Sequence, residues 1–174
     1  MSHRLFDSVA AEYDAVRPDY PSQLFDALES AMGQPLLGAD VLDVGAGTGI
    51  ASRALAGRGA RVVALDPGER MLDVLRSRST SRVRAVIGNG NALPFKDSLF
   101  DLAVFAQSLH WTDLERAPAE ALRVLKPGGV LAAWWNRPDT SVPWFAAHRQ
   151  RVFARCQEPT HVEPPTIATL LGQP

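Results

Sequence analysis

Short apolar runs alternate along this chain with longer segments in which apolar residues recur every three or four positions. The first kind of run is typical of buried parallel strands and the second of helices that cover a sheet. We expect strands at 40–44, 61–65, 82–87, 100–106 and 129–135, and helical spacing is clear at Met71, Leu72 and Leu75 and over 114–125. The alternation predicts an α/β fold, a doubly wound, mainly parallel Rossmann-like sheet with strand order 3-2-1-4-5 and helices on both faces.

Proline and glycine residues affect the last predicted helix and the turn that follows it. Pro118 lies inside the helical segment 114–125, so the helix either begins near it or is kinked there. The sequence Lys-Pro-Gly-Gly at 126–129 predicts the end of that helix and a turn into the fifth strand.

The segments outside the strand region differ in character. The leader, 1–37, predicts two helices around Pro18 and Pro21, and the core follows at 38–136. The last segment, 137–174, is rich in proline and predicts one helical piece near 145–154. At 174 residues the chain fits a single domain built from these three parts.

Composition narrows the possible partners and the location. The net charge of −1 makes no electrostatic case for nucleic acid, and no uncharged apolar stretch reaches the roughly 18 residues that would span a bilayer. Cys156 is the one cysteine, so no internal disulfide can form, and the first residues lack the apolar segment of a signal peptide. These features predict a cytoplasmic protein.

A glycine-rich turn follows the first predicted strand. Its glycines, Gly45, Gly47 and Gly49, alternate with other residues, and Ile50 stands where the dinucleotide-binding fingerprint has its third glycine. Glycines permit a sharp turn and a close approach of the backbone to a ligand, and helix amides then face that ligand. The turn therefore predicts a nucleoside site without a pyrophosphate, where Asp43 is available to a cationic amine.

From this turn onward the chain resembles the class I S-adenosylmethionine-dependent methyltransferases, in particular the type 11-like enzymes that act on small molecules. The segment 88–95, Gly-Asn-Gly-Asn-Ala-Leu-Pro-Phe, is similar to the family's Gly-Asp-Ala-x-x-Leu-Pro-Phe segment, which supports the adenine. The resemblance implies S-adenosylmethionine as cofactor and S-adenosylhomocysteine as product. It places Asn89, where the family usually has aspartate, and Ala92 in the adenine wall, although a surface turn of glycine and asparagine explains the segment equally.

Asp66 ends the second strand about 20 residues after the glycine turn, the position from which an acidic side chain chelates ribose hydroxyls. A cap for the following helix is the alternative, and both roles can coexist. Pro67 and Met71 follow it and are expected in the same cofactor site.

Gln107 directly follows the predicted fourth strand, 100–106, and His110 and Trp111 come within the next four residues. Because open α/β sheets bind ligands at the carboxyl ends of their strands, we expect Gln107 and His110 to face the reaction site. His110 is a candidate base or orienting group for an oxygen acceptor, and a structural histidine beside Trp111 is the alternative. Trp111 is expected near the acceptor, although tryptophans more often serve packing.

The leader sequence Tyr-Asp-Ala-Val-Arg-Pro-Asp-Tyr-Pro at 13–21 resembles a segment that packs over the cofactor as a lid in related enzymes. Tyr13, Arg17 and Tyr20 are its candidate lid or substrate residues. Arg17 offers a fork for a carboxylate, or is a solvated arginine between two turns.

The resemblance ends near residue 135, where the family continues into a helix and an antiparallel strand pair. We expect that pair to be missing or incomplete, because the apolar run at 167–171 could form at most one short strand. The fifth strand would then leave an apolar edge that a second copy or the tail would cover, unless the chain is a fragment of a longer protein. A homodimer over this edge is one expectation.

The expected function is methyl transfer to an unidentified small-molecule acceptor, without a metal, since no histidine or cysteine cluster suggests one. The first alternative is an inactive module that binds S-adenosylmethionine as a partner or sensor. The second, a nicotinamide-dependent oxidoreductase, is disfavoured by Ile50.

Overall fold

The computed structural model describes residues 10–136, 141–144, 147–148 and 150–151, and the chain divides into two compact units, Met1–Trp134 and Trp135–Pro174. The boundary lies two residues before the predicted end of the core. In the second unit, residues 143–144, 147–148 and 150–151 are helical, which overlaps the helical piece predicted near 145–154. The apolar run Ile167–Leu171 lies outside the described residues.

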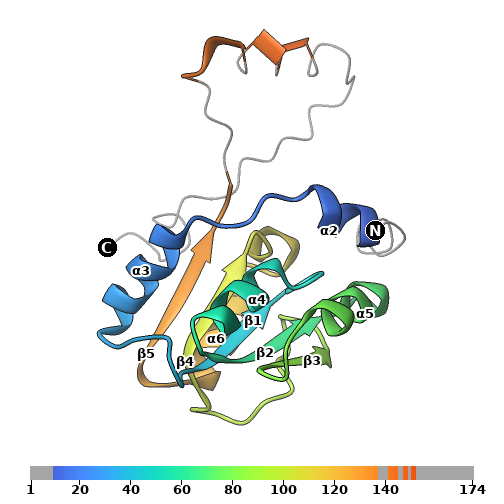
Figure 1. Ribbon diagram of the computed structural model, residues 1–174. Helices are drawn as coiled ribbons and strands as arrows, with labels where there is room; N and C mark the ends of the chain where they lie inside the picture. Colours follow the sequence, from blue (N-terminus) through green and yellow to red (C-terminus); the bar gives the residue numbers. More distant parts are fainter. Residues whose placement is uncertain (1–9, 137–140, 145–146, 149, 152–174) are drawn as a thin grey trace. The chain divides into compact units, whose positions relative to one another are not determined.

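The first unit contains one five-stranded sheet, as expected (Figure 1). All described strand pairs are parallel, and the order is β3-β2-β1-β4-β5. The strands are β1 (Asp40–Val44), β2 (Arg61–Asp66), β3 (Val83–Ile87), β4 (Phe100–Ala106) and β5 (Leu125–Trp134). The predicted fold class and strand order are therefore confirmed.

Three helices cover one face of the sheet. Helices α3 (Ser22–Met32) and α4 (Ile50–Gly57) share a buried apolar cluster with β1, β2 and β4, and α5 (Glu69–Arg78) packs its Leu72 and Leu75 on β2 and β3. Strand residues whose side chains point to the other face, such as Phe105, are also fully buried. The loop at Gly90 approaches Phe105 on that other face. Helix α6 (Arg116–Val124) contacts β5 and buries Ala117, among others.

The start of α6 explains how the helix accommodates Pro118. The helix begins at Arg116 rather than near Leu114, so the proline falls in the first turn, where backbone N–H groups have no acceptor within the helix. The Asp113 carboxylate accepts hydrogen bonds from the backbone N–H groups of Glu115 and Arg116, both at 3.0 Å. Pro118 therefore neither kinks nor breaks α6.

The fifth strand begins four residues earlier than predicted. Leu125 already pairs with Phe100, and the register then shifts between Phe100 and Leu102. Gly128 has a positive φ of 80° within this irregular stretch, which glycine tolerates without the steric penalty of a side chain. The Lys-Pro-Gly-Gly sequence thus forms an irregularity inside β5 instead of a turn before it.

One face of β5 is covered by the leader. Val130, Ala132 and Trp134 pack against the cluster that includes α3, and the rings of Tyr20 and Trp134 meet edge to face with centroids 5.6 Å apart. Strand β5 is still the last strand of the sheet order, so the backbone edge that we expected lies there. Whether a second copy covers it stays a prediction.

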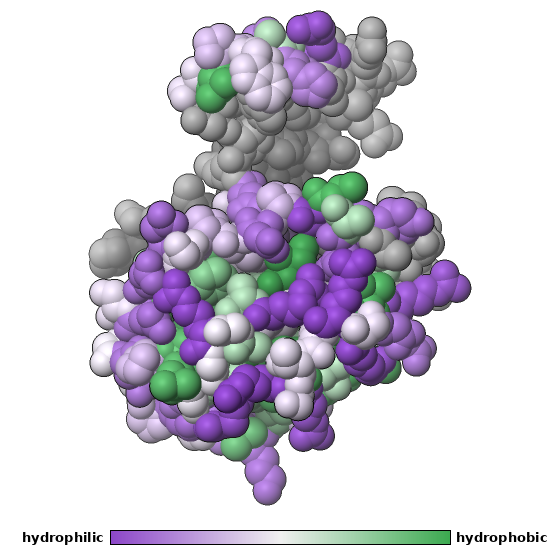
Figure 2. All heavy atoms as spheres, in the orientation of Figure 1, coloured by the Kyte–Doolittle hydropathy of each residue, from purple (hydrophilic) through white to green (hydrophobic). Residues whose placement is uncertain are grey.

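Polar side chains dominate the face of the core seen in Figure 2, where apolar side chains form small separate groups. In the described part of the chain, no helix has both the length and the hydropathy needed to cross a membrane.

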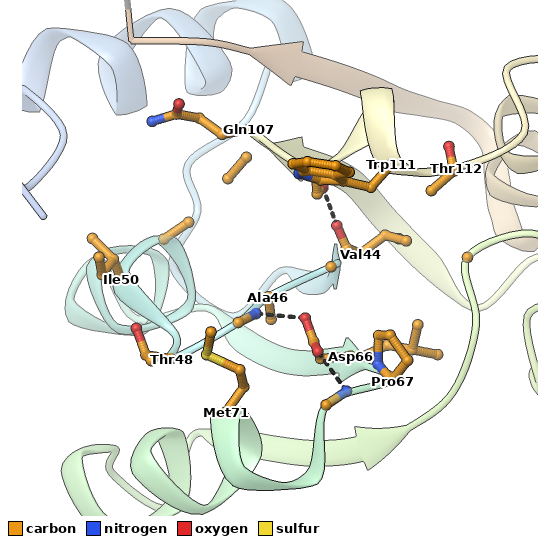
Figure 3. A pocket seen from close by; sticks show the side chains of 18 of the residues that line it. Val44, Ala46, Thr48, Ile50, Asp66, Pro67, Met71, Gln107, Trp111 and Thr112 are labelled. Atoms are coloured by element: carbon orange, nitrogen blue, oxygen red, sulfur yellow. Dashed lines mark hydrogen bonds between the residues drawn. The ribbon is translucent and has the colours of Figure 1, made fainter. Parts of the chain in front are cut away.

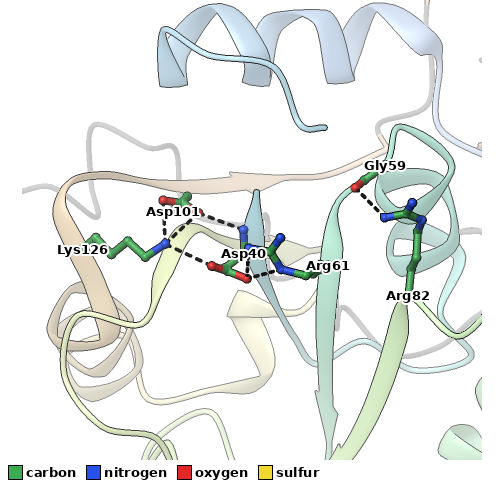
Figure 4. Close-up of polar contacts among 6 residues, drawn as sticks. All are labelled: Asp40, Gly59, Arg61, Arg82, Asp101 and Lys126. Atoms are coloured by element: carbon green, nitrogen blue, oxygen red, sulfur yellow. Dashed lines mark hydrogen bonds and ion pairs between the residues drawn. The ribbon is translucent and has the colours of Figure 1, made fainter. Parts of the chain in front are cut away.

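A group of charged residues joins the amino ends of four strands (Figure 4). The Lys126 ammonium lies 2.9 Å from Oδ1 of Asp101 and 3.1 Å from Oδ2 of Asp40, and Arg61 lies 2.7 Å from the other Asp40 oxygen. Asp101 also accepts a hydrogen bond from the Asp40 backbone N–H at 2.8 Å. These contacts hold β5 to β1 and β4 at the end of the sheet opposite the glycine loop.

We predict that Asp101→Asn lowers the free energy of unfolding at pH 7 by about 1 kcal/mol, because the amide keeps an acceptor for Asp40 but loses the charge that faces Lys126. Burial alone raises the pKa of Asp101, but its hydrogen bonds and the nearby positive charges outweigh burial and lower that pKa below 3.8. A lowered carboxyl pKa contributes stability above the unfolded pKa, and this contribution is lost as pH falls through the folded pKa.

Urea unfolding measures the difference in free energy of unfolding between the wild type and Asp101→Asn, at pH 7 and again as pH falls below 4. The exposed Asp73→Asn, whose partner is Arg76, is the control and should change stability by only a few tenths of a kcal/mol. A difference for Asp101→Asn that is the same at acidic and neutral pH would exclude the charge as its cause.

Candidate functional site

A cavity of about 350 Å³ lies at the carboxyl ends of β1, β2 and β4 (Figure 3). Its wall is formed by the glycine loop after β1, the turn after β2, the loop after β3, the end of β4 and the leader. The volume falls in the range of about 300–1,000 Å³ that small-molecule sites occupy. This is the edge at which parallel α/β sheets bind ligands.

The three glycines of the loop meet different constraints. All have positive φ, of 72°, 55° and 86° at Gly45, Gly47 and Gly49. A Cβ at Gly45 would lie 2.5 Å from that of Ser108, and one at Gly49 would lie 2.7 Å from Cγ of Leu75, whereas a Cβ at Gly47 would meet nothing within 4 Å. The outer glycines are therefore required by packing, and Gly47 leaves open space beside the cavity.

The Asp66 carboxylate supports two walls of the cavity at once. Its Oδ2 accepts a hydrogen bond from the Gly47 N–H and its Oδ1 accepts one from the Gly68 N–H, both at 2.8 Å (Figure 3). The side chain lines the cavity. Because each carboxylate oxygen has two lone pairs, Asp66 can keep these bonds and accept two hydroxyl groups of a ligand. Its bond to Gly68 holds the turn before α5, but the N-cap of that helix is Gly68 without a side-chain cap bond, so Asp66 is not the cap that the alternative expected.

Asp43 lies beneath the loop rather than in the cavity wall. Its side chain is fully buried, and Oδ2 accepts a hydrogen bond of 2.6 Å from the Ser52 hydroxyl on α4. Burial, and to a smaller extent the negative charge of Asp66, raises the pKa of Asp43 to about 6 against the effect of the Ser52 hydrogen bond. In this position Asp43 joins β1 to α4 and supports the loop from below.

The loop after β3 brings Asn89, Gly90 and Asn91 to the cavity. Oδ1 of Asn89 accepts a hydrogen bond from the Asn91 N–H at 2.9 Å, and Oδ1 of Asn91 accepts one from the Asp113 N–H at 2.9 Å. The predicted turn therefore exists, and it also forms a wall of the cavity. Ala92 pairs with the Asn89 backbone and does not line the cavity.

Two residues of α6 hold the continuation of this loop. Glu120 accepts a hydrogen bond from the Leu93 N–H at 2.8 Å, and it pairs with Arg123 at 2.8 Å. Arg123 in turn donates to the carbonyl oxygens of Leu93 and Phe95, at 3.2 Å and 2.9 Å. The loop has little regular structure, so these side chains provide the hydrogen-bond partners that a strand or helix would otherwise provide.

The end of β4 is strained where it reaches the cavity. Gln107 has a φ of 59°, which is uncommon for a residue with a side chain and is found most often at functional sites. Its N–H donates to the Trp134 carbonyl at 2.9 Å, and its Oε1 accepts a bond of 3.3 Å from Arg17. The next residue, Ser108, is buried and donates its hydroxyl hydrogen to the Val44 carbonyl oxygen.

His110 and Trp111 belong to a short 3-10 helix, Leu109–Trp111, and both line the cavity. Their ring centroids are 4.7 Å apart, and 47% of Trp111 is exposed. Burial lowers the pKa of His110 below 6.5, and the positive charge of Arg17 lowers it further. The imidazole is therefore neutral at pH 7 and able to accept a proton.

The leader contributes Arg17, Pro18 and Tyr20 to the cavity. The side chain of Tyr13 lies outside the described part of the structure, although its backbone belongs to α2 (Ala10–Val16). Arg17 reaches from the leader to Gln107, directly after β4, which is a cavity position rather than the solvated position that we kept as an alternative.

The cavity brings together most of the predicted site residues. Its wall includes Gly45, Gly47, Asp66, Pro67, Met71, Asn89, Gln107, His110, Trp111, Arg17 and Tyr20. It does not include Asp43, Gly49 or Ala92. Among the residues that the structure describes, no group of three or more histidine, cysteine or acidic side chains is placed to hold a metal ion.

Sequence reasoning missed several contributors. Ser108 and Thr112 line the cavity, and Glu120 and Arg123 hold the β3–β4 loop from a distance. Nothing in the sequence marks Ser108, since its importance depends on the approach of Gly45. Asn91 lay within the recognised segment, and its polar side chain was a signal that we did not use.

Comparison with known proteins agrees with this arrangement. A sequence profile of the methyltransferase domain matches residues 42–133, which include all five strands except parts of the first and last. The chain belongs to the class I S-adenosylmethionine-dependent methyltransferases.

The curated relatives that this methyltransferase matches are themselves named as methyltransferases. The chain is 41% identical over 139 residues to an uncharacterized methyltransferase of Mycobacterium tuberculosis, covering 80% of this chain and 55% of the relative. It is 38% identical over 131 residues to a demethylmenaquinone methyltransferase of Clavibacter sepedonicus, covering 72% and 54%. The chain thus spans about half the length of the curated relatives it matches.

A solved methyltransferase structure is also similar to this chain. The structure of a putative type II methyltransferase from Anaeromyxobacter dehalogenans superposes with a TM-score of 0.62 at 32% identity, covering 79% of this chain and 56% of that one.

The glycine loop generates a stability prediction. Gly45→Ala should lower the free energy of unfolding by about 3 kcal/mol, because a left-handed alanine costs about 1 kcal/mol and its Cβ would displace the buried Ser108. Gly47→Ala meets no atom and should lose only about 1 kcal/mol. Urea denaturation of the two variants measures the difference, and equal losses would contradict the packing role of Gly45.

Proposed function

We propose that this chain binds S-adenosylmethionine in the cavity and transfers its methyl group to a small-molecule acceptor. The observation that carries the proposal is the Asp66 carboxylate, which is fixed by two backbone N–H groups and lines the cavity together with the glycine loop. A carboxylate held in this way is suited to two neighbouring ribose hydroxyls.

The remaining walls fit the rest of the cofactor. Pro67, Met71 and the Asn89–Asn91 turn offer apolar surface and amide groups for an adenine, and Asn89 replaces the family's aspartate with a neutral acceptor. Ile50 and Ala51 begin α4 at the other end of the cavity, where the N-terminus of a helix favours a carboxylate. The carboxylate of Asp66 gives the cavity wall a negative charge, which suits a cationic sulfonium.

When bound, the cofactor supplies an activated methyl group. The residues of the chain orient the two reactants and exclude water, and these are the tasks in which a protein contributes most to such a transfer. The leader residues Arg17, Pro18 and Tyr20 limit access to the cavity. His110 is neutral and can accept the proton of an oxygen or nitrogen acceptor at its ring nitrogen, or orient that acceptor.

The acceptor site lies between the leader and the end of β4. Arg17 and His110 give it polar groups, and Trp111 gives it an aromatic wall that is partly exposed. One relative is named a demethylmenaquinone methyltransferase, after a quinone.

The competing proposal, a module that binds the cofactor without transferring its methyl group, predicts binding with no turnover on any acceptor. Cytoplasmic location and a homodimer stay predictions.

Asp66→Asn tests the cofactor site. The amide retains one acceptor oxygen and places an NH₂ group against an N–H donor, so we expect S-adenosylmethionine affinity to fall more than about tenfold. Calorimetric titration of the 174-residue chain measures affinity, and circular dichroism reports whether the variant is folded. Asp73→Asn removes the same charge away from the cavity and should bind like the wild type. Unchanged affinity in Asp66→Asn would remove Asp66 from the cofactor site.

The pKa of His110 tests the reaction site without knowledge of the acceptor. We predict that Arg17→Gln raises this pKa, because the positive charge that disfavours the imidazolium is removed while burial remains. Titration of the imidazole resonances by NMR measures it, with His110→Ala to assign the signal among four histidines. A wild-type pKa above 7 would contradict a neutral His110 at pH 7.

A further inference from the structure

Among the side chains of the leader helix α2 that the structure describes, a buried carboxylate makes the main contacts with the rest of the chain. It has seven residues, a length at which an isolated helix is not stable in water. Of the α2 residues whose side chains the structure describes, Ala10 and Asp14 are buried, and Val16 is 80% exposed. A short helix with so little described apolar contact needs another attachment.

Asp14 supplies that attachment. Its side chain is 1% exposed, and Oδ1 lies 2.9 Å from Nη2 of Arg53 on α4. Oδ2 pairs with Nη1 of Arg78 in the last turn of α5. Both carboxylate oxygens therefore meet guanidinium groups, one from each helix beneath the leader. Burial alone raises the pKa of Asp14, but the neighbouring Thr48 hydroxyl, the hydrogen bond from Arg53 and the positive charges of Arg53 and Arg78 outweigh burial and lower the pKa below 3.8. The carboxylate is therefore ionised at neutral pH.

Arg53 extends the attachment to the cavity. Its Nη1 donates a hydrogen bond of 2.6 Å to the carbonyl oxygen of Thr48, which lies between Gly47 and Gly49 in the glycine loop. The guanidinium thus contacts the leader and the loop at the same time. A displacement of the loop changes the position of Arg53, and through it the position of Asp14.

The leader crosses the carboxyl edge of the sheet from α2, beside α5, to α3, beside β5 (Figure 1). Asp14 anchors one end, and the contact of Tyr20 with Trp134 anchors the other. Arg17 and Pro18 lie between these anchors and line the cavity. A ligand in the cavity is therefore in contact with this segment of the leader, and movement of the segment would ease its departure.

We propose that Asp14, with Arg53 and Arg78, is a positioning group that keeps the leader over the cavity and so sets how long the cofactor stays bound. The inference rests on the proposed cofactor site. Ion pairs suit this role because Arg78 is 51% exposed and Arg53 26% exposed, so water can replace each contact when the leader opens. An apolar attachment of the same strength would expose apolar surface at every opening.

Asp14→Asn tests the proposal, because it keeps the shape and one acceptor but leaves two arginines without their anion. We expect S-adenosylhomocysteine to dissociate about tenfold faster, with little change in association rate, since changes at a binding site act mostly on dissociation. Stopped-flow tryptophan fluorescence measures both rates. Arg78→Gln should act in the same direction, and Arg76→Gln, in the same turn of α5 but paired with Asp73, is the matched control and should have no effect.

Hydrogen exchange of the amides of residues 10–20 provides a readout that needs no turnover. We expect exchange in this segment to be faster in Asp14→Asn and Arg78→Gln than in the wild type and Arg76→Gln, both with and without S-adenosylhomocysteine. In the wild type, the ligand should slow exchange there further.

The outcomes separate the two proposals. If the wild type binds no S-adenosylhomocysteine, the proposed function fails, and the exchange comparison without ligand still decides whether Asp14 holds the leader. A lower melting temperature for Asp14→Asn with unchanged dissociation and unchanged exchange at 10–20 would show that Asp14 is merely structural. If Asp14→Asn does not fold, the pair Arg78→Gln and Arg76→Gln gives the same test.

Discussion

The architecture of the site depends on one carboxylate that joins two loops. Asp66 stands at the end of β2, and its two oxygens hold the Gly47 N–H of one loop and the Gly68 N–H of the next. The glycine loop has positive φ at three positions. The backbone N–H groups of Gly45 and Ala46 donate to the Leu65 carbonyl on β2, whereas the Gly47 N–H donates to the Asp66 carboxylate. Asp66 provides this support from a position in the cavity wall.

Further supports surround this central contact. Asp43 holds the glycine loop from below through Ser52, and Gly45 allows Ser108 to approach and bond to Val44. Glu120 and Arg123 hold the loop that follows β3. Each wall of the cavity therefore has its own polar attachment to the rigid sheet or to a helix, which is how a fold places loops with the precision that binding requires.

The fold could be predicted because buried parallel strands are apolar throughout and their order follows from right-handed crossovers. Strands β1 and β4 begin and end where the apolar pattern predicted. The prediction was wrong at the start of β5, because Lys126 and the pairing of Leu125 with Phe100 draw the Lys-Pro-Gly-Gly segment into the sheet. A local pattern of proline and glycine contains no information about a partner 25 residues away.

The same limit applies to the site. Spacing predicted that Asp66, Gly45 and Gly47 lie at one cavity, because they sit on or next to strand ends, where the fold determines position. It could not show that Asp43 is buried away from the cavity, since a polar residue at a strand end looks the same in either case. Nor could it find the contact of Asp14 with Arg53 and Arg78, which lie 39 and 64 residues away in the chain. Such contacts come from tertiary packing alone.

A crystal structure of the 174-residue chain with S-adenosylhomocysteine tests the central claim most directly. The account predicts that both ribose hydroxyls lie within hydrogen-bond distance of the Asp66 carboxylate while it keeps its bonds to Gly47 and Gly68, with the adenine against the Asn89–Asn91 turn. A ligand bound elsewhere, or bound here without contact to Asp66, would contradict it.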